Sequence, residues 1–311
     1  MEIWQADTGG KVYGGNADAK ITLYDKSTDL PVSNDDVKYQ IIATNPSTQD
    51  VLNALCYLNQ PFAGAGFTTN FLPAVAYQES GLNGRFRQFI RYDPVSDTCN
   101  SRTTSTCLPA TGVPVQSFDN GYGIMQITKG IPGGLTGGAC QSPLSQPTLY
   151  IPTTNTPTQN MIWNWVANIN AGAAVMLDKY KEEIAYENKV FNDLNRNNLG
   201  YLWVSPTTEQ RQMNVWQRYN GCPGGKGCYY VIRCVDANGN IQPTTNYKNP
   251  CLSVPQCDPS DPDYNSTYSC QWVKNPNINE LPKQCKKINS TYVYADCVKY
   301  WSDLNPQWCL Q

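Results

Sequence analysis

The residue whose type and setting most strongly suggest chemistry is Glu79, within residues 72–81 (LPAVAYQESG). Leu72, Val75 and Ala76 precede Glu79 by seven, four and three positions, a spacing that places all four side chains on one stripe of a helix. We therefore expect this acid to point inward with its apolar neighbours. Burial raises the pKa of a carboxyl group because it disfavours the charged form.

The end of the predicted helix favours the protonated acid as well. Gly81 predicts that the helix ends there, so Glu79 lies close to the negative end of the helix dipole. A carboxyl group that holds its proton near neutral pH can protonate a leaving oxygen, as a general acid does. The alternative is an ordinary capping or surface glutamate at a helix end, since perturbed acids also occur outside active sites.

Three downstream segments add to this pattern, and together with residues 78–81 they resemble the lytic transglycosylases and goose-type lysozymes of the lysozyme-like superfamily. Residues 78–81 (QESG) look like the catalytic E-S-G segment of that family. The other matching segments, in the order of the family, are GYGIMQI at 121–127, Asn168-Ile169 with Gly172, and Tyr219-Asn220-Gly221.

The resemblance implies a lysozyme-like helical core whose cleft binds the glycan strands of peptidoglycan, with Glu79 as catalytic acid and base. It implies that Tyr219 approaches the Glu79 carboxyl group, that the Gln126 amide faces substrate, and that Asn168 braces the active-site region. The remaining expected substrate contacts are Ser80, Tyr122, Met125 and Asn220. Periodicity alone indicates a core aromatic at Tyr219, and residues 121–127 alone indicate a β-turn before a short buried strand.

The sequence departs from the goose-type pattern at the second carboxylate. Glycoside hydrolysis usually needs two carboxylates, but the matching positions hold Ser117 and Thr128, and Asp119 lies two residues from the first. Lytic transglycosylases need one acid, because the muramoyl C6 hydroxyl attacks C1 within the same molecule. We therefore expect a transglycosylase that forms 1,6-anhydro ends. The alternatives are a muramidase with Asp119 as second acid, a catalytically silent glycan-binding or structural module, and an adhesin or toxin whose cysteine-rich tail is the working part.

The composition favours a sugar polymer over nucleic acid as the binding partner. A formal net charge of −2 argues against nucleic acid, while 20 Tyr and 8 Trp can stack on sugar rings and bond their hydroxyls. The chain has no histidine, which excludes Ser-His-Asp and Cys-His catalysis and removes the commonest metal ligand. We expect no metal and no other cofactor, and no apolar run approaches the length of a membrane span.

The 13 cysteines predict disulfides and an oxidising compartment, because no C-x-x-C pair occurs to hold a metal. The odd count leaves one cysteine free or bonded to another chain. Cys99 and Cys107 could close a loop, or each could pair elsewhere. The start of the chain is too polar for a signal peptide, so the signal has been removed or export uses another route. We expect a secreted, periplasmic or extracellular protein, or part of an exported or virion-associated assembly.

The expected fold class is α+β, predominantly α, in three segments. Residues 1–46 form a small β extension with strands at 20–24 and 37–43, and residues 47–225 form the catalytic domain. Within this domain we expect a helix that begins at Ser47, a long helix that begins at 159, and a further helix after a cap at 207–210. The polar run at 181–188 is expected to be a solvated helical surface. Residues 226–311 hold most of the nine cysteines found from Cys222 onward, in an irregular region with a hairpin across 229–235 and 241–245.

Overall fold

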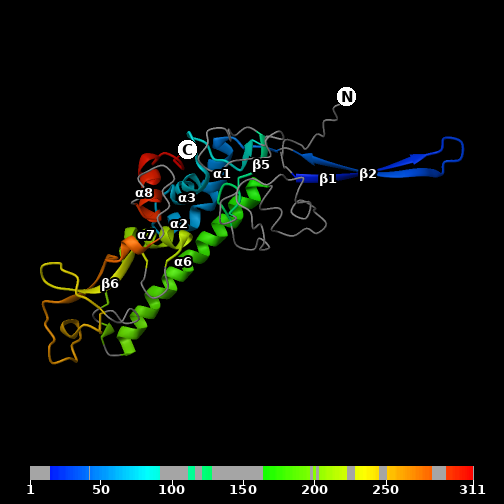
Figure 1. The fold of residues 1–311 in the computed structure, drawn as a ribbon. Helices are drawn as coiled ribbons and strands as arrows, with labels where there is room; N and C mark the ends of the chain where they lie inside the picture. Colours follow the sequence, from blue (N-terminus) through cyan, green and yellow to red (C-terminus); the bar gives the residue numbers. More distant parts are fainter. Residues whose placement is uncertain are drawn as a thin grey trace. The chain divides into compact units, whose positions relative to one another are not determined.

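The computed structural model describes residues 15–41, 43–91, 111–115, 121–127, 164–196, 199–200, 203–222, 228–244, 251–281 and 292–310, and Figure 1 shows their helices and strands. Helix predominates over strand in this part of the chain, which confirms a helix-rich α+β class. The chain divides into two compact units. The first unit comprises Met1–Leu55 and Glu79–Gly172, and the second comprises Cys56–Gln78 and Ala173–Gln311.

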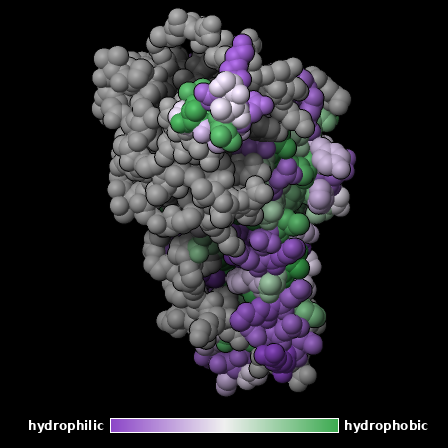
Figure 2. Space-filling view, turned by 90° about the vertical axis from the view of Figure 1, so that its right-hand side faces the viewer, coloured by the Kyte–Doolittle hydropathy of each residue, from purple (hydrophilic) through white to green (hydrophobic). Residues whose placement is uncertain are grey.

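The first unit begins with an antiparallel hairpin of β1 (Gly15–Tyr24) and β2 (Pro31–Ile41), paired from Gly15↔Ile41 onward (Figure 1). Both predicted strands are therefore confirmed and begin earlier than predicted, although β2 ends at Ile41 and not at 43. Asp25 organises the turn, because its Oδ1 accepts hydrogen bonds from the backbone N–H groups of Ser27 (2.8 Å) and Thr28 (3.0 Å). The tip exposes Leu23, Leu30 and Val32 among hydrophilic side chains, and Figure 2 shows this mixture at the end of the hairpin that faces the viewer.

A small sheet follows in the first unit, with the order β3 (Ala43–Thr44), β5 (Thr111–Pro114) and β4 (Phe89–Arg91), all antiparallel. Helix α1 (Thr48–Leu58) then begins where the sequence predicts. Ser47 caps it, because the Ser47 Oγ accepts a hydrogen bond from the Asp50 N–H (3.1 Å) and donates one to the Asp50 carboxylate (2.6 Å).

The helices of the second unit surround an aromatic core. They are α2 (Gln60–Gly64), most of α3 (Phe71–Ser80) and of α6 (Trp165–Arg196), α7 (Thr208–Asn220) and α8 (Tyr294–Leu304). Phe71 stacks on Phe62 at 4.7 Å and on Trp216 at 5.3 Å between ring centroids. The predicted cap of α7 is confirmed as a capping box, in which Thr207 and Gln210 each bond the backbone of the other.

Helix α6 differs from the prediction in its polar second half. It continues to Arg196, and the run at 181–188, predicted to be a solvated surface, includes the buried residues Glu183 and Glu187. The prediction was wrong there because local hydrophilicity says nothing about ion-pair partners on another helix.

The cysteine-rich region contains β6 (Tyr230–Val235) paired antiparallel with β7 (Ser269–Lys274), followed by α8. Short helical turns η3 (Pro255–Cys257) and η4 (Ile278–Glu280) also occur. A turn does follow β6, with Gly239 at φ +84°, and the chain returns beside the end of β6 through the bridge Val235↔Ile241 and a hydrogen bond from the Gln242 N–H to the Cys234 carbonyl oxygen (2.8 Å). The predicted hairpin is therefore limited to the end of β6. The strand that pairs with β6 along its length is β7, more than thirty residues further on, where no local pattern indicates the pairing.

Four disulfides in the described residues confirm the cysteine chemistry that the sequence predicts: Cys56–Cys309, Cys222–Cys228, Cys234–Cys257 and Cys251–Cys270. The four cysteines of the last two disulfides belong to a small core that also includes Ile232, Val254 and Trp272. Cys99 and Cys107 lie outside the described residues. Among the helices that the structure describes, none combines the length and the apolar character that crossing a bilayer requires.

Candidate functional site

Helix α3 carries Glu79 in its last turn and ends at Ser80, directly before Gly81, as the sequence predicts. Nine of its ten residues are buried, and Glu79 alone is partly exposed. The apolar stripe of Leu72, Val75 and Ala76 is buried, but so are the other faces of the helix. Glu79 is therefore less buried than a position on a single inward stripe predicts, and it is the residue at which this buried helix is partly exposed.

Two consecutive residues connect the end of α3 to the turn at 121–127 within the first unit. Arg87 donates from Nε to the Ser80 carbonyl oxygen (2.8 Å) and from its backbone N–H to the Ser80 Oγ (3.4 Å). Gln88 accepts a hydrogen bond from the Ile124 N–H at its Oε1 (3.0 Å). Ser80, the residue after Glu79, and the GYGIMQI segment are thus bonded by the two consecutive residues directly before β4.

The turn itself is closed by paired backbone hydrogen bonds between Tyr122 and Ile127, each 3.1 Å long. Gln126 has φ +48°, in the left-handed region that residues with a Cβ rarely occupy. The Gln126 Nε2 donates to the Gly123 carbonyl oxygen (2.7 Å), and the side chain remains partly exposed while Tyr122, Ile124 and Met125 are buried. The partly exposed Gln126 amide therefore lies beside the buried apolar side chains of the same turn.

The Asn168 side chain on α6 forms hydrogen bonds with the backbone of this turn. It is wholly buried, and its Nδ2 donates to the Tyr122 carbonyl oxygen (2.8 Å) while its Oδ1 accepts from the Met125 N–H (2.8 Å). A Cβ on Gly172, one turn along α6, would lie 2.4 Å from the Met125 side chain. The two sequence segments singled out separately, GYGIMQI and Asn168 with Gly172, therefore form one packed structure in the first unit.

The other predicted site residues are placed as follows. Tyr219 and Asn220 form the end of α7 in the second unit, where Tyr219 is partly exposed and stacks on Tyr294 (6.4 Å between centroids, 24° between planes). Asp119, the predicted second acid, lies outside the described residues, as do Ser117 and Thr128. The first unit thus brings together Tyr122, Met125, Gln126 and Asn168, and it also contains Glu79 and Ser80.

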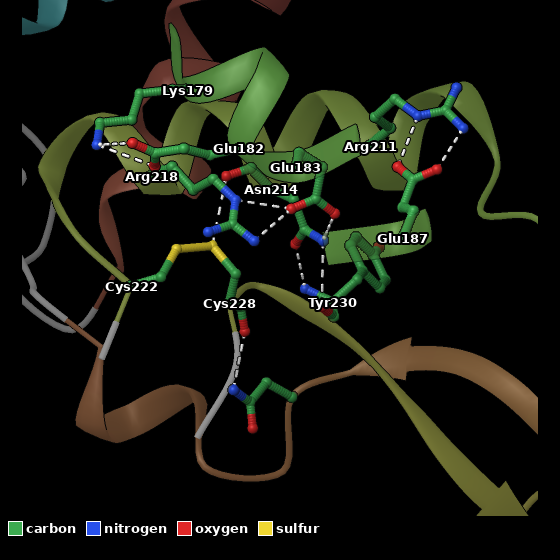
Figure 3. Close-up of polar contacts among 11 residues, drawn as sticks. Lys179, Glu182, Glu183, Glu187, Arg211, Asn214, Arg218, Cys222, Cys228 and Tyr230 are labelled. Carbon is green, nitrogen blue, oxygen red and sulfur yellow. Dashed lines mark hydrogen bonds and ion pairs between the residues drawn. A yellow bond between two sulfur atoms is a disulfide. The ribbon is translucent and has the colours of Figure 1, made fainter. Parts of the chain in front are cut away.

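Sequence reasoning missed a buried charged cluster between α6 and α7, drawn in Figure 3. Glu183 is wholly buried, and its carboxylate accepts hydrogen bonds from the Arg218 Nε (2.7 Å) and the Asn214 Nδ2 (2.7 Å). The Asn214 Oδ1 in turn accepts from the Tyr230 N–H (2.6 Å), which attaches β6 to the cluster. Burial raises the pKa of Glu183, although Arg218 and Asn214 act in the opposite direction.

A second ion pair continues the cluster along the same two helices. Glu187 receives two hydrogen bonds from Arg211, from Nε to Oε1 (2.7 Å) and from Nη2 to Oε2 (2.8 Å) (Figure 3). The acids are four residues apart on α6, and Arg211, Asn214 and Arg218 recur at three and four on α7. This matching periodicity was the available signal, because it places acids and their partners on facing stripes of two helices. The cluster binds the helices together with every carboxylate oxygen satisfied, as a structural ion-pair network does.

Comparison of the chain with protein-family models, with curated proteins and with solved structures gave no match. The chain's own residues therefore carry the functional proposal.

Proposed function

We propose that this protein cleaves the β-1,4 glycosidic bond between N-acetylmuramic acid and N-acetylglucosamine in peptidoglycan, with Glu79 as the single acid and base. The observation that carries the proposal is the place of Glu79, the one partly exposed residue of an otherwise buried helix. Partial exposure at the end of a buried helix gives a substrate access to this residue. The negative end of the helix dipole also opposes its ionisation.

The proposed reaction needs no second carboxylate. The Glu79 carboxyl group donates its proton to the glycosidic oxygen, and the bond from C1 to that oxygen breaks. The resulting carboxylate takes the proton of the muramoyl C6 hydroxyl, whose oxygen bonds to C1 and closes a 1,6-anhydro ring. The acid is thereby returned to its protonated form, and the effective concentration of the internal hydroxyl is high.

The turn at 121–127 supports a role in holding the sugar chain. Its buried base and its bonds to Asn168 and Gln88 make it rigid, and a preorganised polar group loses little conformational entropy when it binds. We assign the direct substrate contact to the partly exposed Gln126. Tyr122, Met125 and Ser80, which the resemblance also gives as contacts, are buried and support that surface from within. The roles expected of Tyr219, Asn168 and Asn220 from the resemblance to lytic transglycosylases are part of the same proposal.

The disulfides support the proposed place of action. Peptidoglycan lies outside the cytoplasm, and disulfides such as Cys56–Cys309 persist in oxidising compartments. We propose that the protein is secreted or periplasmic and acts on the wall directly or as part of an exported or virion-associated assembly.

The test uses the full chain and purified peptidoglycan, with mass spectrometry of the released fragments. Fragments lighter by one water than the hydrolysis products carry 1,6-anhydro ends and support the transglycosylase. Full-mass reducing ends would instead assign a muramidase that activates water, with Asp119 as candidate base. Glu79→Gln is the matched control because it keeps the size of the side chain and removes the transferable proton. Glycan binding without release of fragments by the wild-type protein would overturn the proposal in favour of a silent module.

A further inference from the structure

Helix α8 lies in the cysteine-rich region, yet its first turn packs against the last turn of α7. Its residues Tyr294, Cys297 and Val298 are wholly buried. The Ala295 N–H donates to the Oε1 of Gln217 (3.1 Å), and Tyr294 stacks on Tyr219. The start of α8 therefore contacts the part of α7 that ends in Tyr219 and Asn220.

The C-terminal part of α8 bonds Asn70, directly before α3, and Gln78, in the last turn of α3. Before the first residue of α3, the Asn70 Nδ2 donates to the carbonyl oxygens of Ser302 (2.8 Å) and Asn305 (2.8 Å), and the Asn70 Oδ1 accepts from the Ser302 Oγ (2.7 Å). In the last turn of α3, the buried Gln78 accepts a hydrogen bond at Oε1 from the Trp301 Nε1 (2.9 Å). Gln78 is the residue before Glu79.

Aromatic packing and a disulfide hold α8 in this place. The ring of Trp301 meets Tyr77 edge-on (4.9 Å between centroids), and Trp308 packs on the same tyrosine (5.3 Å). The next residue, Cys309, is bonded to Cys56 near the end of α1, closing a loop of 253 residues. A crosslink across so long a loop strongly restricts the unfolded chain, and it fixes the C-terminal segment to the end of α1.

We propose that α8 positions the last turn of α3, and that Trp301 is the positioning residue that sets the direction of Glu79 through Gln78. The proposal rests on the function proposed for Glu79. The last turn of a helix has unpaired carbonyl groups and frays unless it is held. The Trp301 N–H bonds the Gln78 amide and the Trp301 ring packs on Tyr77, so α8 contacts both residues that directly precede Glu79. Helix α8 then supports the catalytic acid from a distance, through the end of α3, whereas the β6–β7 part of the cysteine-rich region takes no part in this role.

The decisive variant is Trp301→Phe in the full chain, because it removes the indole N–H and keeps an aromatic ring against Tyr77. We expect kcat to fall about tenfold with KM within about twofold, since displacement of a reacting group by a fraction of an ångström has effects of this order. The pH profile of kcat should shift as well, because a displaced carboxyl group changes its surroundings. Activity is measured on soluble glycan strands well below the melting temperature of each variant.

Trp272→Phe is the matched control. It removes an indole hydrogen bond of similar length, from Trp272 Nε1 to the Val204 carbonyl oxygen (2.8 Å), at a site that does not touch α3. We expect its kcat to stay within about twofold of the wild type. Equal kcat values for Trp301→Phe and Trp272→Phe would overturn the inference while leaving the function of Glu79 intact. A wild-type protein without activity would instead overturn the proposed function itself.

A double-mutant cycle covers the case in which Trp301→Phe folds poorly. Gln78→Leu removes the acceptor and leaves α8 unchanged, and we expect the same loss of kcat. The double variant Gln78→Leu/Trp301→Phe should be no slower than either single variant, because both remove one interaction. Additive losses would show that the two residues act separately and would contradict the inference.

Discussion

Glu79 and Glu183 are both glutamates on helices, but their burial is the opposite of what their local sequences indicate. Glu183 lies in a run of charged residues, yet it is wholly buried and bonded to Arg218 and Asn214. Glu79 follows a run of apolar residues, yet it is the one partly exposed residue of its helix. Burial alone therefore does not mark a reactive acid. A buried carboxylate whose oxygens are all satisfied stabilises a fold, whereas reaction requires access for a substrate.

The regions around the two acids are also held by different forces. Neutral amides hold the turn at 121–127 in the first unit, where Asn168 and Gln88 bond its backbone. Charged side chains hold α6 to α7 in the second unit, through Arg218 and Arg211. Hydrogen bonds between neutral groups do not titrate, whereas ion pairs respond to pH and to the loss of either partner.

The largest expected effect separates the two glutamates by activity. Glu79→Gln should lower turnover by about 10² to 10⁴-fold, the usual contribution of a positioned acid, with a change in the free energy of unfolding below about 1 kcal/mol. Glycan cleavage and urea unfolding of the same preparation measure both quantities. A Glu79→Gln variant that is as active as the wild type would remove Glu79 from the mechanism.

The next effect concerns stability in the second unit. Arg218→Met keeps the aliphatic stem and leaves Glu183 buried without its cation, which should lower the free energy of unfolding by about 3–5 kcal/mol. Urea unfolding at pH 7 measures the loss. Lys179→Met is the matched control on α6, because it breaks the exposed pair with Glu182 (2.9 Å) and should cost less than about 1 kcal/mol (Figure 3). Equal losses in the two variants would contradict the distinction between the buried and exposed pairs.

A glycine pair tests the packing of the turn in the first unit. Gly123 and Gly84 have similar left-handed φ angles, +73° and +75°, so alanine should incur a similar backbone penalty at both. A Cβ at Gly123 would lie 2.5 Å from the Gln88 amide, whereas a Cβ at Gly84 meets nothing within 4 Å. Gly123→Ala should therefore be less stable than Gly84→Ala by about 1–3 kcal/mol in urea unfolding. The same loss in both variants would show that the contacts with Gln88 and Asn168 contribute little.

The smallest expected effect is the pH dependence that Glu183 contributes. Its pKa is raised by burial, so between pH 4.5 and the raised pKa the folded state keeps a proton that the unfolded chain has already released. Stability should therefore fall as pH rises above 4.5 toward the raised pKa of the folded state, by at most about 1.4 kcal/mol per pH unit. Urea unfolding of the wild type and of Glu183→Gln between pH 4.5 and 7.5 measures the difference. A wild-type slope that the variant retains would assign the effect to other groups.

Local signals in the sequence predicted the elements with local causes. The caps at Ser47 and Thr207 were correct because a cap needs only residues within one helical turn. The strands of the β1–β2 hairpin were found for a similar reason, since neighbouring strands share a turn. The pairing of β6 with β7 and the burial of Glu183 were missed, because each depends on residues that are distant in the sequence.

In the candidate site, too, some features could be predicted from the sequence and others depend on distant contacts. The resemblance singled out the segment at 121–127 and Asn168, and the structure joins them through two hydrogen bonds to one buried side chain. No feature of the sequence indicated that Gln78 receives a hydrogen bond from Trp301, more than two hundred residues away. The role of the cysteine-rich region as a support for α3 could therefore not be predicted.

By itself the sequence determined the types of residue that can react, the absence of histidine chemistry, the disulfide-forming character and the positions of the locally capped helices. Those properties follow from side-chain chemistry and from interactions within a turn of helix. Only the tertiary structure decided which glutamate is buried and which reaches the surface, and which distant helix holds the end of α3. Burial and long-range contact belong to the packed chain as a whole, because each is set by partners that the local sequence does not contain.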